Sequence, residues 1–341
     1  CNYTHFLLFS IIFTYIIPAQ DFLMNGLSRL ASSIHEEWQS LPKPPSPVGS
    51  RVLYATALLN SSQNRYPDVL PFESTRVKLS DPKEYINASY VNIFENGNFI
   101  STQAPLPHTF NTFWKMVWEN KSPVIVMLTK IMEKRKIKAH CYWPALGETE
   151  IFGDISVTLV SETQEKFITI RNLEIQCEDE VHCLCHLQYT EWPDFGVPRS
   201  TNTIRHLLEL TNEYREQYTT NKDDTPGTVV VHCSAGIGRC GTFLAIQSVL
   251  EKLNANEPPS TISVKEIVTS LREFRMAMVQ TKEQYKFIYH VLEDAARAFS
   301  PLSSPLPSIP AEFHRSSSSD RSALTRSYSD FGPPQHCEIY S

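Results

Sequence analysis

One cysteine and one arginine are spaced for chemistry on an anion. Cys233 ends a β-branched run that begins at Val229. Arg239 follows after five residues, among them Gly236 and Gly238, and apolar residues then recur at helical spacing. A strand, a tight loop and a helix start would turn backbone N–H groups toward one point, where the helix dipole adds positive charge. The pattern predicts a cradle for a phosphate-sized anion, with the guanidinium of Arg239 binding two oxygens.

A thiol in this field should ionise easily. Helix N-termini and nearby cations lower a cysteine pKa from about 8.5 to roughly 3.5–7.5. The resulting thiolate would lie in line for attack on phosphorus, while the loop amides and Arg239 would hold the equatorial oxygens that carry the transition-state charge. We therefore expect a cysteinyl phosphate as intermediate, which water must then hydrolyse.

These residues also fit two other interpretations. Residues 236–241 also match the G-x-G-x-x-G dinucleotide pattern between a strand and a helix. That fold requires βαβ units and an acidic residue at the end of the next strand, and no such alternation follows. Cys233 alone would fit a small buried core residue, but its pairing with Arg239 and two glycines favours a nucleophile.

The wider chain resembles the cysteine-based protein tyrosine phosphatases, of the tyrosine-specific non-receptor type. The resemblance extends from about Arg51 to Ala298, and its blocks occur in the family's order: 64–69, 84–89, 102–105, 113–119, 192–198 and 274–281, with the loop at 229–243. It implies an α+β fold, with one catalytic domain built on a central twisted mixed β-sheet flanked by helices. It places the phosphate-binding loop between a strand and a helix. It also implies tyrosine-phosphorylated proteins as substrates, with no cofactor and no metal.

The resemblance assigns four catalytic residues. Cys233 is the nucleophile and Arg239 binds the phosphate. Asp194 is the general acid, carried by a mobile loop that closes over the substrate and protonates the leaving tyrosyl oxygen. Gln280 orients the water that attacks the intermediate. An isolated turn aspartate or surface glutamine would be unremarkable, so both roles depend on the neighbouring cysteine loop.

The resemblance also assigns substrate-binding and supporting residues. Tyr66 would stack on the phosphotyrosine ring and wall a deep pocket, and Asp68 would accept N–H groups from the substrate backbone, although Tyr-Pro-Asp also fits plain turn chemistry. Phe195 would press on the ring, and Lys138 would reach the lid or the phosphate. The phosphate-binding loop comprises Ser234, Ala235, Gly236, Ile237, Gly238 and Arg239. The supporting residues are Glu133, which would pair with Arg239, and His232, Cys240 and Gln284.

The sequence departs from the family pattern beside the nucleophile. Cys240 stands where serine or threonine is usual, and a thiol is a weaker hydrogen-bond donor than a hydroxyl. We expect slower breakdown of the phosphoenzyme. A disulfide that traps oxidised Cys233 is an alternative role for Cys240, which helix geometry disfavours. Ala104, Glu84 and Ala139 also depart from the pattern but touch no catalytic atom.

Three functions are compatible with these residues. The leading hypothesis is a phosphotyrosine-protein phosphatase. The alternative is a pseudophosphatase, a phosphotyrosine-binding module with weak turnover because of Cys240. A dual-specificity phosphatase is the third, and the block around Tyr66 and the extended Trp-Pro-Asp loop argue against it.

Composition limits the function further. The 341 residues are 41% hydrophobic, and 31 basic against 37 acidic residues give a net charge of −6, which argues against a nucleic-acid partner. The eight cysteines form no disulfide framework, and a nucleophilic thiolate requires a reducing compartment. We expect a cytoplasmic location. Residues 182–186 resemble a His/Cys metal cluster, but strand alternation would point neighbouring side chains to opposite faces.

Four segments are expected along the chain. Residues 1–20 form an apolar segment of uncertain origin, 21–50 a helix-like stretch and Pro-rich linker, 51–299 the catalytic domain, and 300–341 a disordered Ser/Pro-rich tail. Because Cys1 is not an initiator, the chain is expected to be incomplete or processed. Residues 6–17 are too short alone for a membrane span of roughly 20 residues, so membrane association stays open. Serines after arginine in the tail are candidate kinase targets that could bind a phospho-dependent partner.

Periodicity predicts the main elements of the domain. Strands are expected at 124–129, 155–160, 167–175 and 183–189. Helices are expected at 203–218, 241–253, 264–275 and 283–298. Consecutive strands followed by a helical C-terminal part favour one α+β domain.

Overall fold

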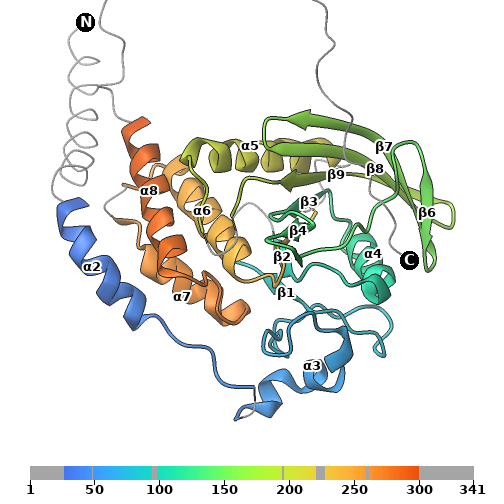
Figure 1. Ribbon diagram of the computed structural model, residues 1–341, viewed down its shortest axis with the longest axis horizontal. Coiled ribbons are helices and arrows are strands. Elements are labelled where there is room, and N and C mark those ends of the chain that lie inside the picture. Colours follow the sequence, from blue (N-terminus) through green and yellow to red (C-terminus); the bar gives the residue numbers. More distant parts are fainter. Residues whose placement is uncertain are drawn as a thin grey trace, which may run out of the picture. The chain divides into compact units, whose positions relative to one another are not determined.

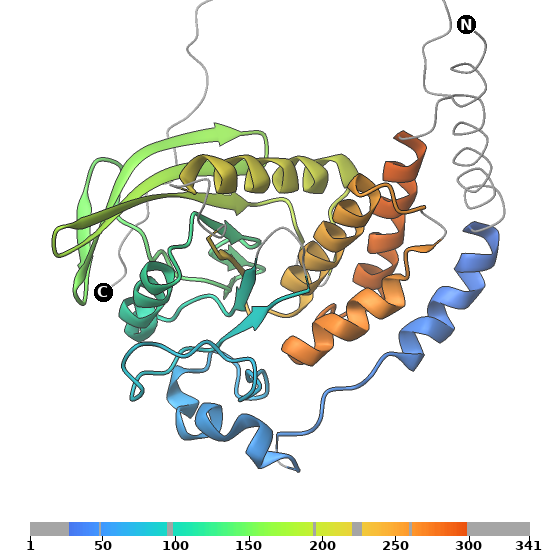
Figure 2. The same cartoon turned by 180° about the vertical axis from the view of Figure 1, so that it is seen from behind.

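The computed structural model describes residues 27–47, 49–93, 98–193, 196–219, 227–258 and 261–298. A mixed eight-stranded sheet forms its centre, in the order β1-β2-β10-β3-β9-β8-β7-β6. Figures 1 and 2 show the sheet twisted, with helices on both of its faces. The predicted α+β class with a central mixed sheet is therefore confirmed. The predictions for residues 1–20 and 300–341, and for Asp194 and Phe195, lie outside the described residues.

The strands divide into a parallel centre and antiparallel flanks. β10 pairs in parallel with both β2 and β3, and β3 pairs in parallel with β9, whereas the other pairs are antiparallel. The bounds are β1 Ala88–Val91, β2 Phe99–Thr102, β3 Val124–Met127, β6 Thr149–Phe152, β7 Ile155–Glu165, β8 Ile168–Cys177, β9 Glu180–Tyr189 and β10 Val229–His232. A separate small hairpin consists of β4 Met132–Glu133 and β5 Lys136–Ile137.

The α-helices are α2 Leu27–Ser40, α3 Ala55–Leu59, α4 Phe110–Glu119, α5 Thr201–Tyr218, α6 Gly238–Asn254, α7 Val264–Phe274 and α8 Lys282–Ala298. Short 3-10 helices are η2 Arg51–Tyr54, η3 Ser61–Gln63 and η4 Pro107–Thr109. Side-chain alternation along the central strands divides the core. One hydrophobic cluster joins Val124, Val126 and Val231 to α5, α6 and α8, and it includes Cys233. The other joins Ile125, Met127 and Val230 to α4.

The predicted elements are present, with different ends. Strand 124–129 ends at Met127, and the three strands at 155–160, 167–175 and 183–189 extend to 155–165, 168–177 and 180–189. The β7–β8–β9 ladder continues past the apolar residues, because backbone pairing holds it together where the side chains are exposed. The helix predicted at 241–253 begins at Gly238, which puts Arg239 in its first turn. Helix 203–218 begins at Thr201 with a Ser200 cap, whose hydroxyl accepts from the Asn202 N–H.

The His/Cys run at 182–186 lies on β9 and its side chains diverge. His182 packs against the Trp118 ring, with centroids 4.5 Å apart. Cys183 is exposed, whereas Cys185 and His186 are buried, on opposite faces of the sheet. The strand geometry explains why these four side chains cannot converge on one ion.

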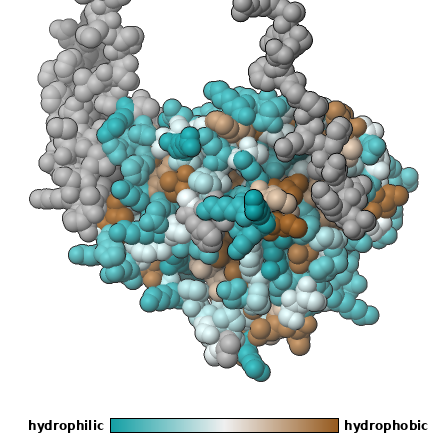
Figure 3. Space-filling view, in the orientation of Figure 1, coloured by the Kyte–Doolittle hydropathy of each residue, from teal (hydrophilic) through white to brown (hydrophobic). Residues whose placement is uncertain are grey.

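The surface of the described part is largely hydrophilic in the view of Figure 3, with small apolar patches. Its most exposed apolar side chains include Val52, Leu59, Ile151 and Leu146. Among the helices described, none combines the length and the apolar character that a membrane crossing needs.

Candidate active site

The loop Cys233–Ile237 joins the end of β10 to the start of α6. Gly236 has φ +71°, and a Cβ added there would lie 2.2 Å from the Thr102 carbonyl oxygen, so the loop requires glycine at this position. Its N–H donates to Cys233 Sγ at 3.3 Å, and its carbonyl accepts from Ser101 Oγ at 3.0 Å. The turn therefore directs an amide at the thiol and turns the carbonyl away from it.

Cys233 is acidified although only 5% of it is exposed. A hydrogen bond from the Cys240 side chain is the largest influence, and it lowers the pKa of Cys233 to about 5 together with the Arg239 charge and the amides of Cys240 and Gly236. Burial acts in the opposite direction and is outweighed. Burial raises the pKa of Cys240 well above its ordinary value, and the neighbouring Cys233 raises it further. At neutral pH the pair therefore consists of a thiolate and a thiol that donates to it.

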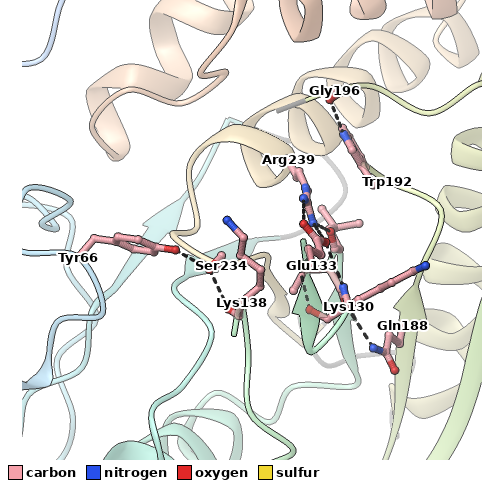
Figure 4. A network of polar contacts seen from close by, with 11 residues as sticks. Tyr66, Lys130, Glu133, Lys138, Gln188, Trp192, Gly196, Ser234 and Arg239 are labelled. Atoms are coloured by element: carbon pink, nitrogen blue, oxygen red, sulfur yellow. Dashed lines mark hydrogen bonds and ion pairs between the residues drawn. The ribbon is translucent and has the colours of Figure 1, made fainter. Parts of the chain in front are cut away.

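Arg239 is held by a buried carboxylate from the β4–β5 hairpin (Figure 4). Its NH1 donates to Glu133 Oε1 at 2.7 Å and its NH2 to Oε2 at 2.6 Å, and NH1 also donates to the Leu128 carbonyl at 3.0 Å. Burial opposes ionisation of Glu133, but the hydrogen bonds and charge of Arg239 outweigh it and hold the pKa of Glu133 below its usual value. This bidentate pair fixes the plane of the guanidinium beside the loop.

Arg275 lies behind the loop and was not singled out from the sequence as a site residue. It is fully buried and donates to the carbonyls of Gly236 at 2.8 Å and Ala235 at 3.1 Å. It also donates to Asn87 Oδ1 at 2.6 Å. Burial lowers the pKa of Arg275 to about 10, which leaves it charged. By binding two loop carbonyls on the far side, it leaves the amides to face the anion. Its place in the family-like block 274–281 was the available signal.

Tyr66, Ser234 and Lys138 form a chain at the edge of the loop (Figure 4). Ser234 Oγ donates to the Lys138 carbonyl at 2.7 Å, so the Tyr66 hydroxyl, 2.9 Å away, donates to Ser234 Oγ. Lys138 is 9% exposed, while Asp68 is exposed on the segment after Tyr66. The hydrogen bond thus ties the predicted ring-stacking residue to the loop that follows Cys233.

Gln280 and Gln284 lie over the first turn of α6. Gln284 Oε1 accepts from the Gln280 N–H at 2.9 Å. A Cβ added at Gly238 would lie 3.0 Å from Gln280 Oε1 and 3.2 Å from Gln284 Nε2. Both side-chain amides therefore border the helix start that ends the anion loop.

The Trp-Pro-Asp segment is described on both sides of Asp194 and Phe195. Trp192 is 2% exposed, and its Nε1 donates to the Gly196 carbonyl at 3.0 Å (Figure 4). The Gly196 N–H donates to the Pro193 carbonyl at 3.2 Å. These bonds join the described residues on the two sides of the segment. Asp194 and Phe195 themselves lie outside the described part of the chain, so their predicted positions stay predictions.

His232 is the last residue of β10 and supports the loop from below. It is fully buried, and its Nδ1 lies 3.0 Å from the Cys233 carbonyl oxygen. Its Nε2 lies 2.7 Å from the hydroxyl of Tyr142, a buried residue that no sequence motif marked as part of the site.

Comparisons of the sequence with known proteins point to one family. A family model described as Protein-tyrosine phosphatase matches residues 60–294. Receptor-type tyrosine-protein phosphatase eta of Gallus gallus is 40% identical over 246 residues, which are 70% of this chain and 17% of that protein. Tyrosine-protein phosphatase Lar-like of Caenorhabditis elegans is 40% identical over 253 residues, 72% of this chain and 11% of the relative.

Tyrosine-protein phosphatase non-receptor type 2 of Homo sapiens is 38% identical over 244 residues, which are 70% of this chain and 57% of the relative. The chain therefore spans only part of the length of each of these relatives. Receptor and non-receptor types match it at similar identity.

Proposed function

This chain belongs to the protein-tyrosine phosphatase family, and from that premise we propose that it hydrolyses phosphotyrosine in proteins. The observation that carries the proposal is the pair formed by the Cys233 thiol and Arg239. The thiol has a pKa of about 5, and the guanidinium is clamped in one plane by Glu133. A thiolate beneath a fixed bidentate cation is suited to attack on a phosphate ester. The pseudophosphatase alternative gains no support from the comparisons.

The proposed reaction has two displacements at phosphorus. In the first, Cys233 Sγ forms a bond to phosphorus while the bond from phosphorus to the tyrosyl oxygen breaks, and Asp194 gives a proton to the leaving oxygen. In the second, a water molecule oriented by Gln280 attacks phosphorus, the S–P bond breaks, and the Asp194 carboxylate takes back a proton from the water. The products are tyrosine, inorganic phosphate and the regenerated thiolate.

The loop and its supports stabilise charge in both steps. The amides of residues 234–238 and the Arg239 fork would bind the equatorial oxygens, where charge accumulates. Fixing Arg239 through Glu133 removes reorganisation at the moment of reaction. Lys138 and Gln284 lie beside this loop and would support the phosphate and the water, respectively.

Selectivity for tyrosine is assigned to the rim of the site. Tyr66 would stack on the substrate ring, Phe195 would press on that ring, and Asp68 would accept from the peptide backbone. A phosphoserine is too short to bring its phosphorus down to Cys233 past such a wall. The need for a reduced thiolate favours the cytoplasm.

The test uses the full chain and a matched cysteine control. Wild-type protein and Cys183→Ser, which changes the exposed thiol on β9, should hydrolyse p-nitrophenyl phosphate equally. Cys233→Ser should lose activity by about 10³-fold or more, because the nucleophile is removed. A phosphotyrosine peptide should be turned over and the same peptide with phosphoserine should not. Turnover that survives in Cys233→Ser, or equal rates on both peptides, contradicts the proposal.

A further inference from the structure

A line of hydrogen bonds runs behind the anion loop, on the face of the sheet that α4 covers. Arg171 on β8 and His186 on β9 are register partners, and Arg171 NH1 lies 3.3 Å from His186 Nδ1. His186 Nε2 lies 2.9 Å from the Tyr142 hydroxyl, which lies 2.7 Å from His232 Nε2. His232 Nδ1 lies 3.0 Å from the Cys233 carbonyl oxygen. The line therefore connects a guanidinium to the backbone of the proposed nucleophile.

Each link can be oriented in only one way. A carbonyl oxygen only accepts, so His232 carries its proton on Nδ1. A guanidinium only donates, so Nδ1 of His186 is bare and the proton of that ring is on Nε2. His186 therefore donates to the Tyr142 oxygen, and the Tyr142 hydroxyl donates to the bare Nε2 of His232. With both rings neutral, every donor in the line meets an acceptor.

The surroundings favour neutral rings. Burial lowers the pKa of His232 to about 4, and the Arg65 charge acts in the same direction. Burial also lowers the pKa of His186 well below its ordinary value, and the electrostatic effects of Arg171 and His232 lower it further. The rings and the Tyr142 hydroxyl are all fully buried, so water cannot replace a lost partner. An unpaired polar atom there would destabilise the folded protein.

The outer end of the line is anchored. Arg171 Nε donates to Glu162 at 2.6 Å, and its NH1 also donates to Gln188 Oε1 at 3.0 Å. The guanidinium carbon lies 4.5 Å from the centre of the Trp143 ring. These contacts hold the Arg171 guanidinium in place beside His186.

We propose that Arg171 and His186 are positioning residues, which force Tyr142 to donate to His232 and so keep His232 a neutral donor to the Cys233 carbonyl. A group at position 186 that accepted the Tyr142 proton would leave Nε2 of His232 without a donor. His232 would then take up a proton and point Nε2–H at the tyrosyl oxygen. The inference rests on the proposed function in one respect, the role of Cys233 as nucleophile.

The charge of His232 matters for Cys233. An imidazolium behind the loop would stabilise the thiolate beyond the effect of Arg239 and lower its pKa further. The nucleophilicity of a thiolate falls as its pKa falls. A neutral His232 therefore leaves the pKa of Cys233 where Cys240, Arg239 and the loop amides set it, and the thiolate is not made a poorer nucleophile.

The first measurement is made on the wild-type protein. Nitrogen-15 NMR of the histidine rings at pH 6.5 should show the proton of His186 on Nε2 and that of His232 on Nδ1, with both rings neutral. The opposite tautomer at either ring, or a charged His232, overturns the inference. This measurement needs no substrate and no turnover.

The second measurement compares two isosteric variants. In His186→Gln the amide nitrogen can donate to Tyr142 and the amide oxygen can accept from Arg171. In His186→Glu the carboxylate can only accept, so it takes the Tyr142 proton. We expect His232 to stay neutral in the Gln variant and to become charged at pH 6.5 in the Glu variant.

The reactivity of Cys233 should follow His232. The pH at which iodoacetate alkylation of Cys233 is half-maximal should fall by about half a unit or more in His186→Glu, and should stay near the wild-type value in His186→Gln. Equal His232 ionisation in the two folded variants contradicts the inference. If His186→Glu does not fold, the wild-type tautomers decide. Correct tautomers without phosphatase turnover would refute the proposed function and leave the inference standing.

Discussion

Two buried cysteines of this chain behave in opposite ways because their neighbours differ. Cys185 on β9 is surrounded by apolar side chains, and burial raises its pKa. Cys233 is also buried, but the Cys240 side chain, the Arg239 charge and two amides lower its pKa to about 5. Burial alone would make both thiols inert, so the loop that follows β10 is what makes one of them reactive.

The first prediction concerns the pH dependence of Cys233 alkylation. Only the thiolate reacts, so the rate with iodoacetate should rise with pH, reach half its maximum near pH 5, and be flat around neutrality. The exposed Cys183, whose pKa is raised by burial and then by Glu174, should react only at alkaline pH. Mass spectrometry of the alkylated peptides distinguishes the two. Half-maximal reaction of Cys233 above pH 8 would disprove the acidified thiol.

The second prediction concerns Cys240. A serine hydroxyl is a stronger donor than a thiol, so Cys240→Ser should speed breakdown of the phosphoenzyme and raise kcat roughly two- to fivefold. Cys240→Ala, which removes the donor, should slow it. Single-turnover dephosphorylation measured in stopped flow tests both variants. An unchanged or lower rate in the serine variant would show that the Cys240 thiol does not slow breakdown of the phosphoenzyme.

Among the elements, the two-residue strands β4 and β5 have an influence beyond their size. Their hairpin carries Glu133, which meets Arg239 from α6 across 106 positions of sequence. Thr129 Oγ1 also donates to Glu133 Oε1 at 3.0 Å, so the carboxylate is itself oriented. A hairpin at the surface thereby sets the position of the phosphate-binding guanidinium.

The third prediction follows from this contact. Glu133→Gln keeps the shape but replaces the bidentate ion pair by a single hydrogen bond from the guanidinium to the amide oxygen. We expect kcat/KM for a phosphotyrosine peptide to fall about tenfold, which corresponds to about 1.4 kcal/mol. Glu150→Gln on the exposed strand β6 is the control and should retain full activity. An unaltered kcat/KM in Glu133→Gln would show that Arg239 is positioned by other contacts.

The start of α6 is pressed against the segment before α8. The Gly241 N–H donates to the Ile237 carbonyl at 3.0 Å, and the Val279 N–H donates to the same oxygen at 3.1 Å. A Cβ added at Gly241 would lie 2.3 Å from Val279 N. The absent side chain therefore allows the helix bearing Arg239 to approach the segment bearing Gln280.

The fourth prediction tests that approach. Gly241→Ala should lower the free energy of unfolding by about 2–3 kcal/mol, because backbone atoms must move apart. Gly49→Ala, where an added Cβ meets only the Ser46 carbonyl at 4.0 Å, should change it by less than about 0.5 kcal/mol. Urea denaturation followed by circular dichroism provides the comparison. Equal stability of the two variants would show that the backbone around Val279 can move away at little cost in free energy.

For the molecule as a whole, buried neutral histidines couple folding to pH. His186 and His232 have lowered pKa values in the folded state, whereas in the unfolded chain they titrate near 6.5. Below that pH the unfolded state binds more protons, so stability is lost as the pH falls from about 6.5 toward 4. Glu133, whose folded pKa is also lowered, acts with the same sign at still lower pH.

The fifth prediction is the slope of this dependence. Each of the two histidines should contribute about 1.4 kcal/mol per pH unit to the loss of unfolding free energy between pH 6 and 5. His186→Gln should remove one such contribution and flatten the curve. Urea midpoints measured across that range test it. A wild-type stability that is independent of pH would mean that the rings are protonated in the folded state.

The sequence alone determined what depends on near neighbours. Apolar periodicity located α5 and α8 to within two residues of their ends, because a helix is built from bonds four residues apart. The spacing of Cys233 and Arg239 indicated anion chemistry because both residues belong to one short loop and the helix start that follows it. The short strands β1 and β2 were missed and the start of α6 was displaced. Strand pairing and the tight cysteine loop, rather than apolar periodicity, set them.

Only the tertiary structure decided the contacts that join distant segments. β10 enters between β2 and β3, and Arg275 reaches back to two carbonyls of the cysteine loop. The line from Arg171 to Cys233 crosses β8, β9 and β10 through Tyr142. No local pattern encodes such partners, because a buried donor is satisfied by whichever acceptor the packed sheet brings within hydrogen-bonding distance.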